Sequence, residues 1–229
     1  GAINLTPTGG TTPYTFNWGG GITTEDRTGL IAGAYTCTIT DVNTCSITTS
    51  GTVTQPLSAL SATTTVSNVT CFGGNNGAIN LTPSGGTTPY TFNWSGGVTT
   101  EDRTGLIAGA YTCTITDVNT CTITTSTTVT QPLSALSTTT IVTNVSCFGG
   151  NNGAINLTPS GGTSPYTFNW GGGVTTEDRT GLVSGVYTCS VTDANGCLTT
   201  ITSTVTQPTS ALLATTIATN VSCFGGNNG

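Results

Sequence analysis

The stretch Gly77-Ala78-Ile79-Asn80-Leu81-Thr82-Pro83 decides the fold, because the same seven residues stand at 1–7 and again at 153–159. The three starts, at residues 1, 77 and 153, are evenly spaced with a period of 76, and the first two copies differ at only nine of their positions. Near-identical copies at a fixed spacing are typical of arrays in which each unit is one structural module. The sequence therefore predicts a small module repeated in tandem.

Alternation of apolar and polar side chains predicts that each copy consists of short β-strands. In the middle copy the side chains expected to face inward are Ile79, Leu81, Tyr90, Phe92, Trp94, Tyr111, Cys113, Ile115, Ile123 and Val129. A strand is also expected over residues 61–71, with Thr65, Ser67, Val69 and Cys71 on one face. Three large rings at a period of two fit a small buried core, so the aromatic stripe is interpreted as core.

The fold class that follows is all-β: tandem immunoglobulin-like or PKD-like β-sandwich repeats, with a period of 76, that form an extended fibre. We expect a partial first repeat at residues 1–57, which lacks its first strand, and complete second and third repeats at 58–133 and 134–209. Residues 210–229, the terminal segment, are expected to be the first strand and loop of a further repeat. This phasing predicts that the chain is a piece of a longer polypeptide.

The composition excludes several classes of function. Charged residues make up 5% of the chain, whereas ordinary domains have roughly 25%. The net charge is −6, there is no histidine, and the cations are Arg27, Arg103 and Arg179, one in each copy. Nucleic acid is therefore excluded as a partner, since its binding needs a basic surface. The sequence also has no apolar run long enough for a membrane segment.

The nine cysteines, three in each copy, favour disulfides and an oxidising, extracellular compartment. A metal site is not indicated, because the chain has no CxxC motif and no histidine to complete a ligand set.

Four motifs resemble the SprB repeat, a family that builds very large surface adhesins of gliding bacteria. They are VSCFGGNNG at 145–153, GGTSPYTFNW at 161–170, GLVSGVY at 181–187 and VTDANGC at 191–197. The resemblance implies tandem β-sandwich modules, a bacterial cell-surface location and a role in adhesion or gliding motility. It brings no catalytic residue and no cofactor, so the protein is expected not to be an enzyme.

The resemblance also implies two disulfide cysteines in each repeat, which are Cys71 and Cys121, or Cys147 and Cys197. We favour pairing within each repeat, as Cys71–Cys121 and Cys147–Cys197. Pairing across the linkers, as Cys45–Cys71, Cys121–Cys147 and Cys197–Cys223, stays open. The third cysteines, Cys37, Cys113 and Cys189, stand where the family has an apolar residue. We expect them to be buried as small hydrophobic side chains, with cross-linking as the alternative.

The charged stretch at residues 100–104 of the middle copy is a weak candidate for calcium. Glu101 and Asp102, with Asp117 further on, could supply oxygen ligands, but their spacing is not that of a dedicated calcium loop. We favour a solvated loop in which Arg103 forms a local ion pair. Adjacent carboxylates rarely converge on one substrate, so catalysis by Glu101 and Asp102 is not expected.

Covalent glycans are a further expectation, because a surface with few charges needs another source of solubility. The asparagines in Asn-x-Ser/Thr motifs are Asn4, Asn80, Asn156, Asn68, Asn93, Asn144 and Asn220. The outward threonines Thr112, Thr114 and Thr116 are candidates for O-linked sugars.

Three hypotheses of function follow. The favoured one is a structural shaft of an adhesin, whose partners are the neighbouring repeats. The second is a module that binds polysaccharide through aromatic and hydroxyl side chains, and solvent exposure of Trp94 would favour it. The third is a discrete fibre subunit that donates residues 211–229 as a strand to the next chain.

Overall fold

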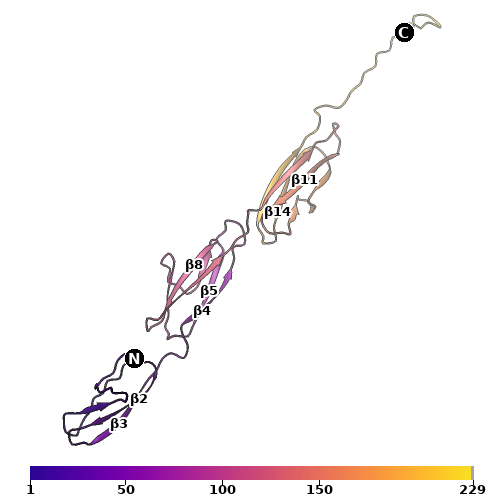
Figure 1. The fold of residues 1–229 in the computed structure, drawn as a ribbon. Coiled ribbons are helices and arrows are strands. Elements are labelled where there is room, and N and C mark those ends of the chain that lie inside the picture. Colours follow the sequence, from indigo (N-terminus) through magenta and orange to yellow (C-terminus); the bar gives the residue numbers. More distant parts are fainter. Residues whose placement is uncertain (228–229) are drawn as a thin grey trace. The chain divides into compact units, whose positions relative to one another are not determined.

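The computed structural model describes residues 1–227 and is all-β with repeated small antiparallel sheets, as predicted. Strands are the regular elements of this part of the chain, and Figure 1 draws them as arrows in the groups formed by successive copies. In chain order they are β1 (Thr15–Asn17), β2 (Gly33–Thr40), β3 (Ser46–Val53), β4 (Ser61–Ser67), β5 (Gly77–Ser84), β6 (Thr91–Trp94), β7 (Arg103–Leu106), β8 (Gly109–Thr116), β9 (Thr122–Val129), β10 (Ser137–Thr143), β11 (Gly153–Ser160), β12 (Thr167–Asn169), β13 (Arg179–Leu182), β14 (Gly185–Thr192) and β15 (Leu198–Val205).

The third repeat shows the architecture most completely. One sheet has the order β10-β11-β13 and the other the order β12-β14-β15. β10 pairs antiparallel with β11 from Ser137↔Ser160 to Thr143↔Ala154. β14 and β15 form a long hairpin that pairs from Gly185↔Val205 to Thr192↔Leu198. The two sheets therefore form a small antiparallel sandwich of the expected kind.

The core of the third repeat lies between these two sheets. Ile155 and Leu182 of the first sheet pack with Val205 of the second, and each is at most 3% exposed. Leu157 packs with Cys189 and Val191 in a second cluster. Because side chains alternate along a strand, each strand contributes one apolar face to this core and one polar face to solvent.

The predicted inward faces of the second repeat are largely confirmed. The side chains that are at most 1% exposed there are Ile79, Leu81, Trp94, Cys113, Ile115 and Val129. Tyr90, Phe92, Tyr111 and Ile123 are half-buried. The aromatic stripe thus contributes to the core, as its spacing predicts.

The predicted face of the first strand of this repeat is wrong. In β4 the half-buried residues are Ala62, Thr64 and Val66, whereas Thr65 and Ser67 are exposed. The alternation changes phase because the strand ends at Ser67. The Asn68 side chain then accepts the Thr130 N–H at 2.9 Å, and Val69 turns into the core at 2% exposure.

Contacts between Cα atoms divide the chain into two compact units. One comprises residues 1–63, 83–92 and 114–124, and the other comprises 64–82, 93–113 and 125–229. The second repeat contributes to both units, so the repeat boundaries at residues 57, 133 and 209 stay a prediction.

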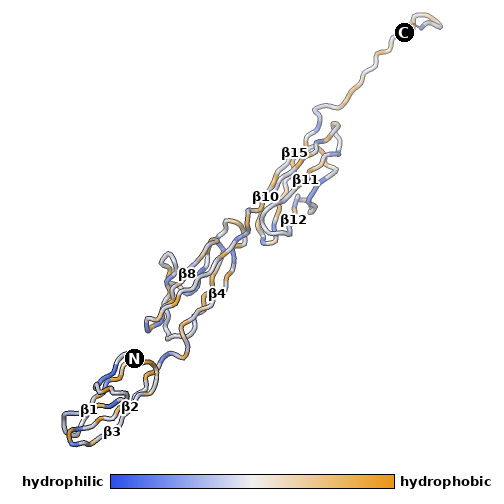
Figure 2. The backbone as a smooth tube through the Cα atoms, viewed as in Figure 1, coloured by the Kyte–Doolittle hydropathy of each residue, from blue (hydrophilic) through white to orange (hydrophobic). Residues whose placement is uncertain are grey.

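Hydrophobic residues are distributed in short stretches along the chain. Figure 2 shows orange and blue segments interspersed along the tube. Within residues 1–227 no helix has the length and apolar character needed to cross a bilayer.

Candidate functional site

The hairpin turn between β14 and β15 is built around one carboxylate. Oδ1 of Asp193 accepts the backbone N–H groups of Asn195 and Cys197 at 2.9 and 2.8 Å, and Oδ2 accepts the N–H of Thr163 at 2.8 Å. Gly196 has φ +82, a left-handed conformation that suits glycine. These bonds hold the Cys197 backbone in one place at the tip of the hairpin.

The loop that follows β4 is fixed in a comparable way. Asn76 accepts the Thr70 N–H at 3.1 Å and donates to the Thr70 hydroxyl at 2.8 Å. The N–H of Gly74 donates to the carbonyl of Cys71 at 2.9 Å, and the N–H of Gly73 donates to the side chain of Gln131 at 2.8 Å. A short polar loop therefore holds Cys71 in a defined position.

These two rigid segments meet, and a disulfide joins Cys71 to Cys197. Their Cα atoms are 5.7 Å apart, within the usual range for a disulfide. Asn195 adds a hydrogen bond of 3.0 Å from its side-chain amide to the carbonyl of Thr70. The bond connects the first loop of the second repeat with the hairpin tip of the third.

The structure therefore corrects both pairing schemes expected from the sequence. Cys71 and Cys197 are disulfide cysteines as expected, but they bond to each other. Cys121 and Cys147 are exposed thiols, and so are Cys45 and Cys223.

Pairing within the third repeat fails because its two cysteines lie at opposite ends of the sandwich. Cys197 precedes β15, whereas the loop of Cys147 lies beside the far end of that strand, where the Val145 N–H donates to the Thr206 carbonyl at 2.9 Å. Seven steps along β15 span about 23 Å at about 3.3 Å per residue. That length far exceeds the roughly 7 Å limit between Cα atoms of a disulfide.

The third cysteine of each copy is buried, as expected. Cys37, Cys113 and Cys189 are each 0% exposed in the core. Burial raises the pKa of the Cys113 and Cys189 thiols, so little thiolate is present near neutral pH.

Alkylation of the native chain at low concentration is expected to modify only the exposed thiols, which are Cys45, Cys121, Cys147 and Cys223. Denaturant alone should add the three buried cysteines, and only a reductant should expose Cys71 and Cys197. Peptide mass mapping after each step measures this order. Labelling of Cys71 or Cys197 before reduction would contradict the observed pairing.

Two of the acidic residues considered as calcium ligands, Asp102 and Asp117, accept hydrogen bonds from backbone N–H groups. Asp102 accepts the Leu81 N–H at 2.9 Å, which ties the loop to β5. Asp117 is the counterpart of Asp193 and accepts the N–H groups of Thr87, Asn119 and Cys121, each at 2.9 Å. Glu101 is exposed. No group of three potential metal-ligating side chains occurs within residues 1–227.

The loop of Glu101 and Asp102 is exposed, as expected, whereas Arg103 packs on aromatic rings in place of the expected local ion pair. Arg103 is half-buried at the start of β7, and its guanidinium lies 5.7 Å from the ring centroids of both Trp94 and Tyr111. The first and third repeats repeat the arrangement, with Arg27 between Trp18 and Tyr35 and Arg179 between Trp170 and Tyr187. The single cation of each copy is thus used in cation–π packing.

The pKa of Asp193 is lowered from its ordinary value of 3.8. Burial alone would raise this pKa, but N–H donation from Cys197, Thr163 and Asn195 outweighs burial. The pKa of Asp193 is lower in the folded chain than in the unfolded chain. The hydrogen bonds to its carboxylate therefore stabilise the folded state fully above about pH 4. This stabilisation is lost as the pH falls through the folded pKa.

Asp193→Asn is therefore expected to lower the free energy of unfolding of the third repeat at pH 7. It should also make that free energy fall less steeply as the pH is lowered into the acid range. Urea unfolding between about pH 2 and about pH 7 measures both effects. Asn195→Ser is a control, because it leaves the carboxylate and its backbone partners in place. An unchanged acid profile in Asp193→Asn would contradict the role given to this carboxylate.

Several of the glycan candidates are sterically available. Asn4, Asn80 and Asn156 are exposed. Asn68 and Asn144 are exposed too, but the side-chain oxygen of each already accepts a backbone N–H at 2.9 Å. The threonines Thr112, Thr114 and Thr116 are half-buried, and the Thr112 hydroxyl lies 2.9 Å from that of Ser126.

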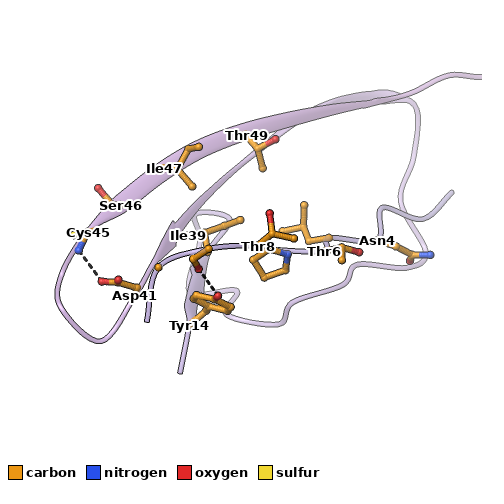
Figure 3. A pocket seen from close by; sticks show the side chains of 14 residues that line it. Asn4, Thr6, Thr8, Tyr14, Ile39, Asp41, Cys45, Ser46, Ile47 and Thr49 are labelled. Carbon is orange, nitrogen blue, oxygen red and sulfur yellow. Dashed lines mark hydrogen bonds between the residues drawn. The ribbon is translucent and has the colours of Figure 1, made fainter. Parts of the chain in front are cut away.

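The first repeat has a groove that sequence reasoning did not identify as a site. It has a volume of about 540 Å³ and lies between residues 4–10 and the hairpin of β2 and β3. Figure 3 shows Asn4, Thr6 and Thr8 on one side and Ile47 and Thr49 on the other.

Comparison with known proteins gives one family and several distant structures. The family model of the SprB repeat matches residues 63–99 and 139–175. No curated protein sequence matches.

Among solved structures, the chain is similar to the eight N-terminal Ig domains of Down syndrome cell adhesion molecule, with 13% identity and a TM-score of 0.37. The match covers 77% of this chain and 28% of that one. Extracellular domains 3–5 of Drosophila OTK match with 14% identity and a TM-score of 0.34. This match covers 78% of this chain and 72% of that one. A tetra-tandem repeat from the extending region of a large adhesion protein matches with 16% identity and a TM-score of 0.23. This match covers 84% of this chain and 66% of that one.

Proposed function

This chain contains two SprB repeats, and on that premise we propose that it is a shaft segment of a long adhesin on a bacterial cell surface. Its partners in this role are the neighbouring repeats of the same fibre. Adhesion and gliding motility are the processes that such a shaft serves.

The observation that carries the proposal is the Cys71–Cys197 disulfide. A backbone linker already connects the two repeats that this bond joins, so the bond adds a second covalent connection. A bond that joins successive repeats limits how far the chain can be extended under tension, which is what a shaft needs. The low charge and the hydroxyl-rich surface fit a module that needs no charged ligand site.

The polysaccharide-binding alternative receives no support from the aromatic stripe. Trp94 is 1% exposed, and its indole N–H donates to the carbonyl of Thr100 at 2.8 Å. Its ring also packs on Arg103. A sugar platform needs exposed ring faces, and this ring is part of the core.

We also propose that the shaft carries glycans. The best acceptors are the exposed asparagines Asn4, Asn80 and Asn156, one in each copy of the GAINLTP stretch. Each lies between an isoleucine and a leucine that face inward, so its own side chain points away from the core. Glycans at these positions supply the solubility that a surface with 5% charged residues lacks. Mass measurement of native peptides that contain these asparagines tests this part of the proposal.

Single-molecule stretching of the 229-residue chain tests the shaft function. The intact disulfide closes a sequence separation of 126 residues, which hides about 45 nm of contour length at about 3.6 Å per residue. We expect the oxidised chain to release less length than the reduced chain, by about 45 nm, and to bear repeated stretching and relaxation.

Two results would overturn the proposal. Equal contour lengths before and after reduction would show that the disulfide does not protect the chain under load. Specific, saturable binding of the chain to a polysaccharide array would favour the binding-module function. Labelling of intact cells with an antibody against the chain tests its surface location independently of both results.

A further inference from the structure

The disulfide between Cys71 and Cys197 shortens the covalent path through the second and third repeats. Along the backbone the two cysteines have a sequence separation of 126 residues. Tension that enters through β4 and leaves through β15 can instead pass from Cys71 to Cys197 across one S–S bond. Residues 72–196, which contain the strands from β5 to β14, then lie outside the tensioned path.

The two strands on this path are already extended. β4 has seven residues and ends at Ser67, and β15 has eight and begins at Leu198, directly after Cys197. A strand rises about 3.3 Å per residue, whereas a fully extended chain spans at most about 3.6 Å per residue. Pulling both strands straight therefore lengthens the path by only about 5 Å.

The short connection between β4 and Cys71 is held in place by hydrogen bonds. The Val69 N–H donates to the Thr130 carbonyl at 2.9 Å. The Thr70 N–H donates to the side-chain oxygen of Asn76 at 3.1 Å. This connection therefore adds little slack between the strand and the disulfide.

We propose that the disulfide acts as a redox-controlled bypass for mechanical load. When it is intact, tension passes along β4, the disulfide and β15, and residues 72–196 stay folded. When it is reduced, the same tension acts through both sandwiches and unfolds them. The inference rests on the proposed shaft function, because a bypass has a use only in a chain that carries tension.

The lengths involved explain why the load leaves the sandwiches folded. A pulling force accelerates unfolding only as far as unfolding lengthens the chain along the pull, because the work done is force times distance. With the connection to Cys71 included, the tensioned path of the oxidised chain can lengthen by about 1 nm. Once the disulfide is open, the separation of 126 residues can release about 45 nm. The same force therefore does far more work on the reduced chain.

Reduction by a small dithiol such as dithiothreitol removes the bypass. One thiolate of the dithiol attacks one sulfur of the disulfide, and the other cysteine leaves as a thiolate that takes up a proton. The second thiol of the dithiol then attacks the mixed disulfide and releases the first cysteine as a thiol. The protein gains two electrons and two protons, and the dithiol becomes a cyclic disulfide.

A force-clamp experiment on single 229-residue chains tests the inference. Each oxidised chain is held at a force that unfolds the second and third repeats of the reduced chain, and dithiothreitol is added under load. We expect only a small extension when the disulfide breaks, because both sandwiches are still folded at that moment. The two repeats should then unfold in two later steps, with the waiting times that they show in chains reduced beforehand.

A matched pair of core variants assigns the steps to repeats. Ile115 of the second repeat lies within residues 72–196, and its counterpart Ile39 of the first repeat lies outside them. Their side chains are 0% and 8% exposed, and the third repeat has Val191 at the same position, so a valine fits this core.

Ile115→Val is expected to shorten the wait for one of the two later steps by up to about fivefold. It should change nothing before the disulfide breaks. Ile39→Val should shorten only the wait for the first repeat, whether or not reductant is present.

Either of two results would contradict the inference. Release of the full length of about 45 nm in a single step, as the disulfide breaks, would show that the sandwiches had already unfolded under load. An extension step before reduction that Ile115→Val accelerates would show that tension reaches the core of the second repeat. In both cases the oxidised and reduced chains still differ in length, so the shaft proposal fails only on its own test.

Discussion

Replacing both Cys71 and Cys197 with serine is expected to lower the free energy of unfolding by about 5 kcal/mol. The bond closes a loop with a sequence separation of 126 residues. In the chain-entropy model a cross-link over a loop of that length removes enough freedom from the unfolded chain to give this value. Equilibrium denaturation of the oxidised chain and the double variant, followed by circular dichroism, measures the difference.

The exposed thiol Cys147 supplies the control for this experiment. It stands in the loop equivalent to that of Cys71, but it is outside the disulfide. Cys147→Ser should change the free energy of unfolding by less than about 0.5 kcal/mol. A double variant as stable as the parent chain would show that the cross-link does not restrict the unfolded state.

Trp94→Ala is expected to cost about 4 kcal/mol. The side chain is 1% exposed, its indole N–H donates to Thr100 at 2.8 Å and its ring packs on Arg103 at 5.7 Å. The substitution leaves a large cavity and removes the cation–π contact together with the hydrogen bond. Urea unfolding, with hydrogen exchange to locate the effect in the second repeat, measures the loss.

Trp18 is a matched control in the first repeat. It has the same hydrogen bond, to Thr24 at 2.8 Å, and the same kind of arginine partner, Arg27 at 5.6 Å, but it is only half-buried. Trp18→Ala should therefore cost about half as much. Equal losses in the two repeats would mean that burial does not determine the contribution of this tryptophan.

Local alternation was enough to predict most of the fold. Ile79, Leu81 and Ile115 lie in the core because period-two spacing in a strand needs no knowledge of distant partners. The buried cysteines were predicted for the same reason. The face of β4 was predicted wrongly, because the phase changes at Asn68, whose side chain bonds to Thr130, far along the chain.

The candidate site depended on longer-range geometry. The pairing of Cys71 with Cys197 requires knowing that the two cysteines of a repeat lie at opposite ends of the sandwich, which spacing alone does not reveal. The role of Arg103 was missed because Glu101 and Asp102 are neighbours in sequence, whereas Trp94 and Tyr111 are its neighbours in space. Asp117 looked like a metal ligand because the sequence does not show which N–H groups its carboxylate accepts.

The disulfide between successive repeats also bears on proteolysis. A single cut of the backbone between residues 72 and 196 leaves two fragments that Cys71 and Cys197 still hold together. If the same bond recurs once in every repeat, the closed loops overlap, because each loop is longer than the period. Every peptide bond of the inner repeats then lies inside at least one loop. Such a fibre stays covalently continuous after a single backbone cut. It separates into fragments only where a protease cuts the backbone and a reductant also breaks the disulfide that spans the cut.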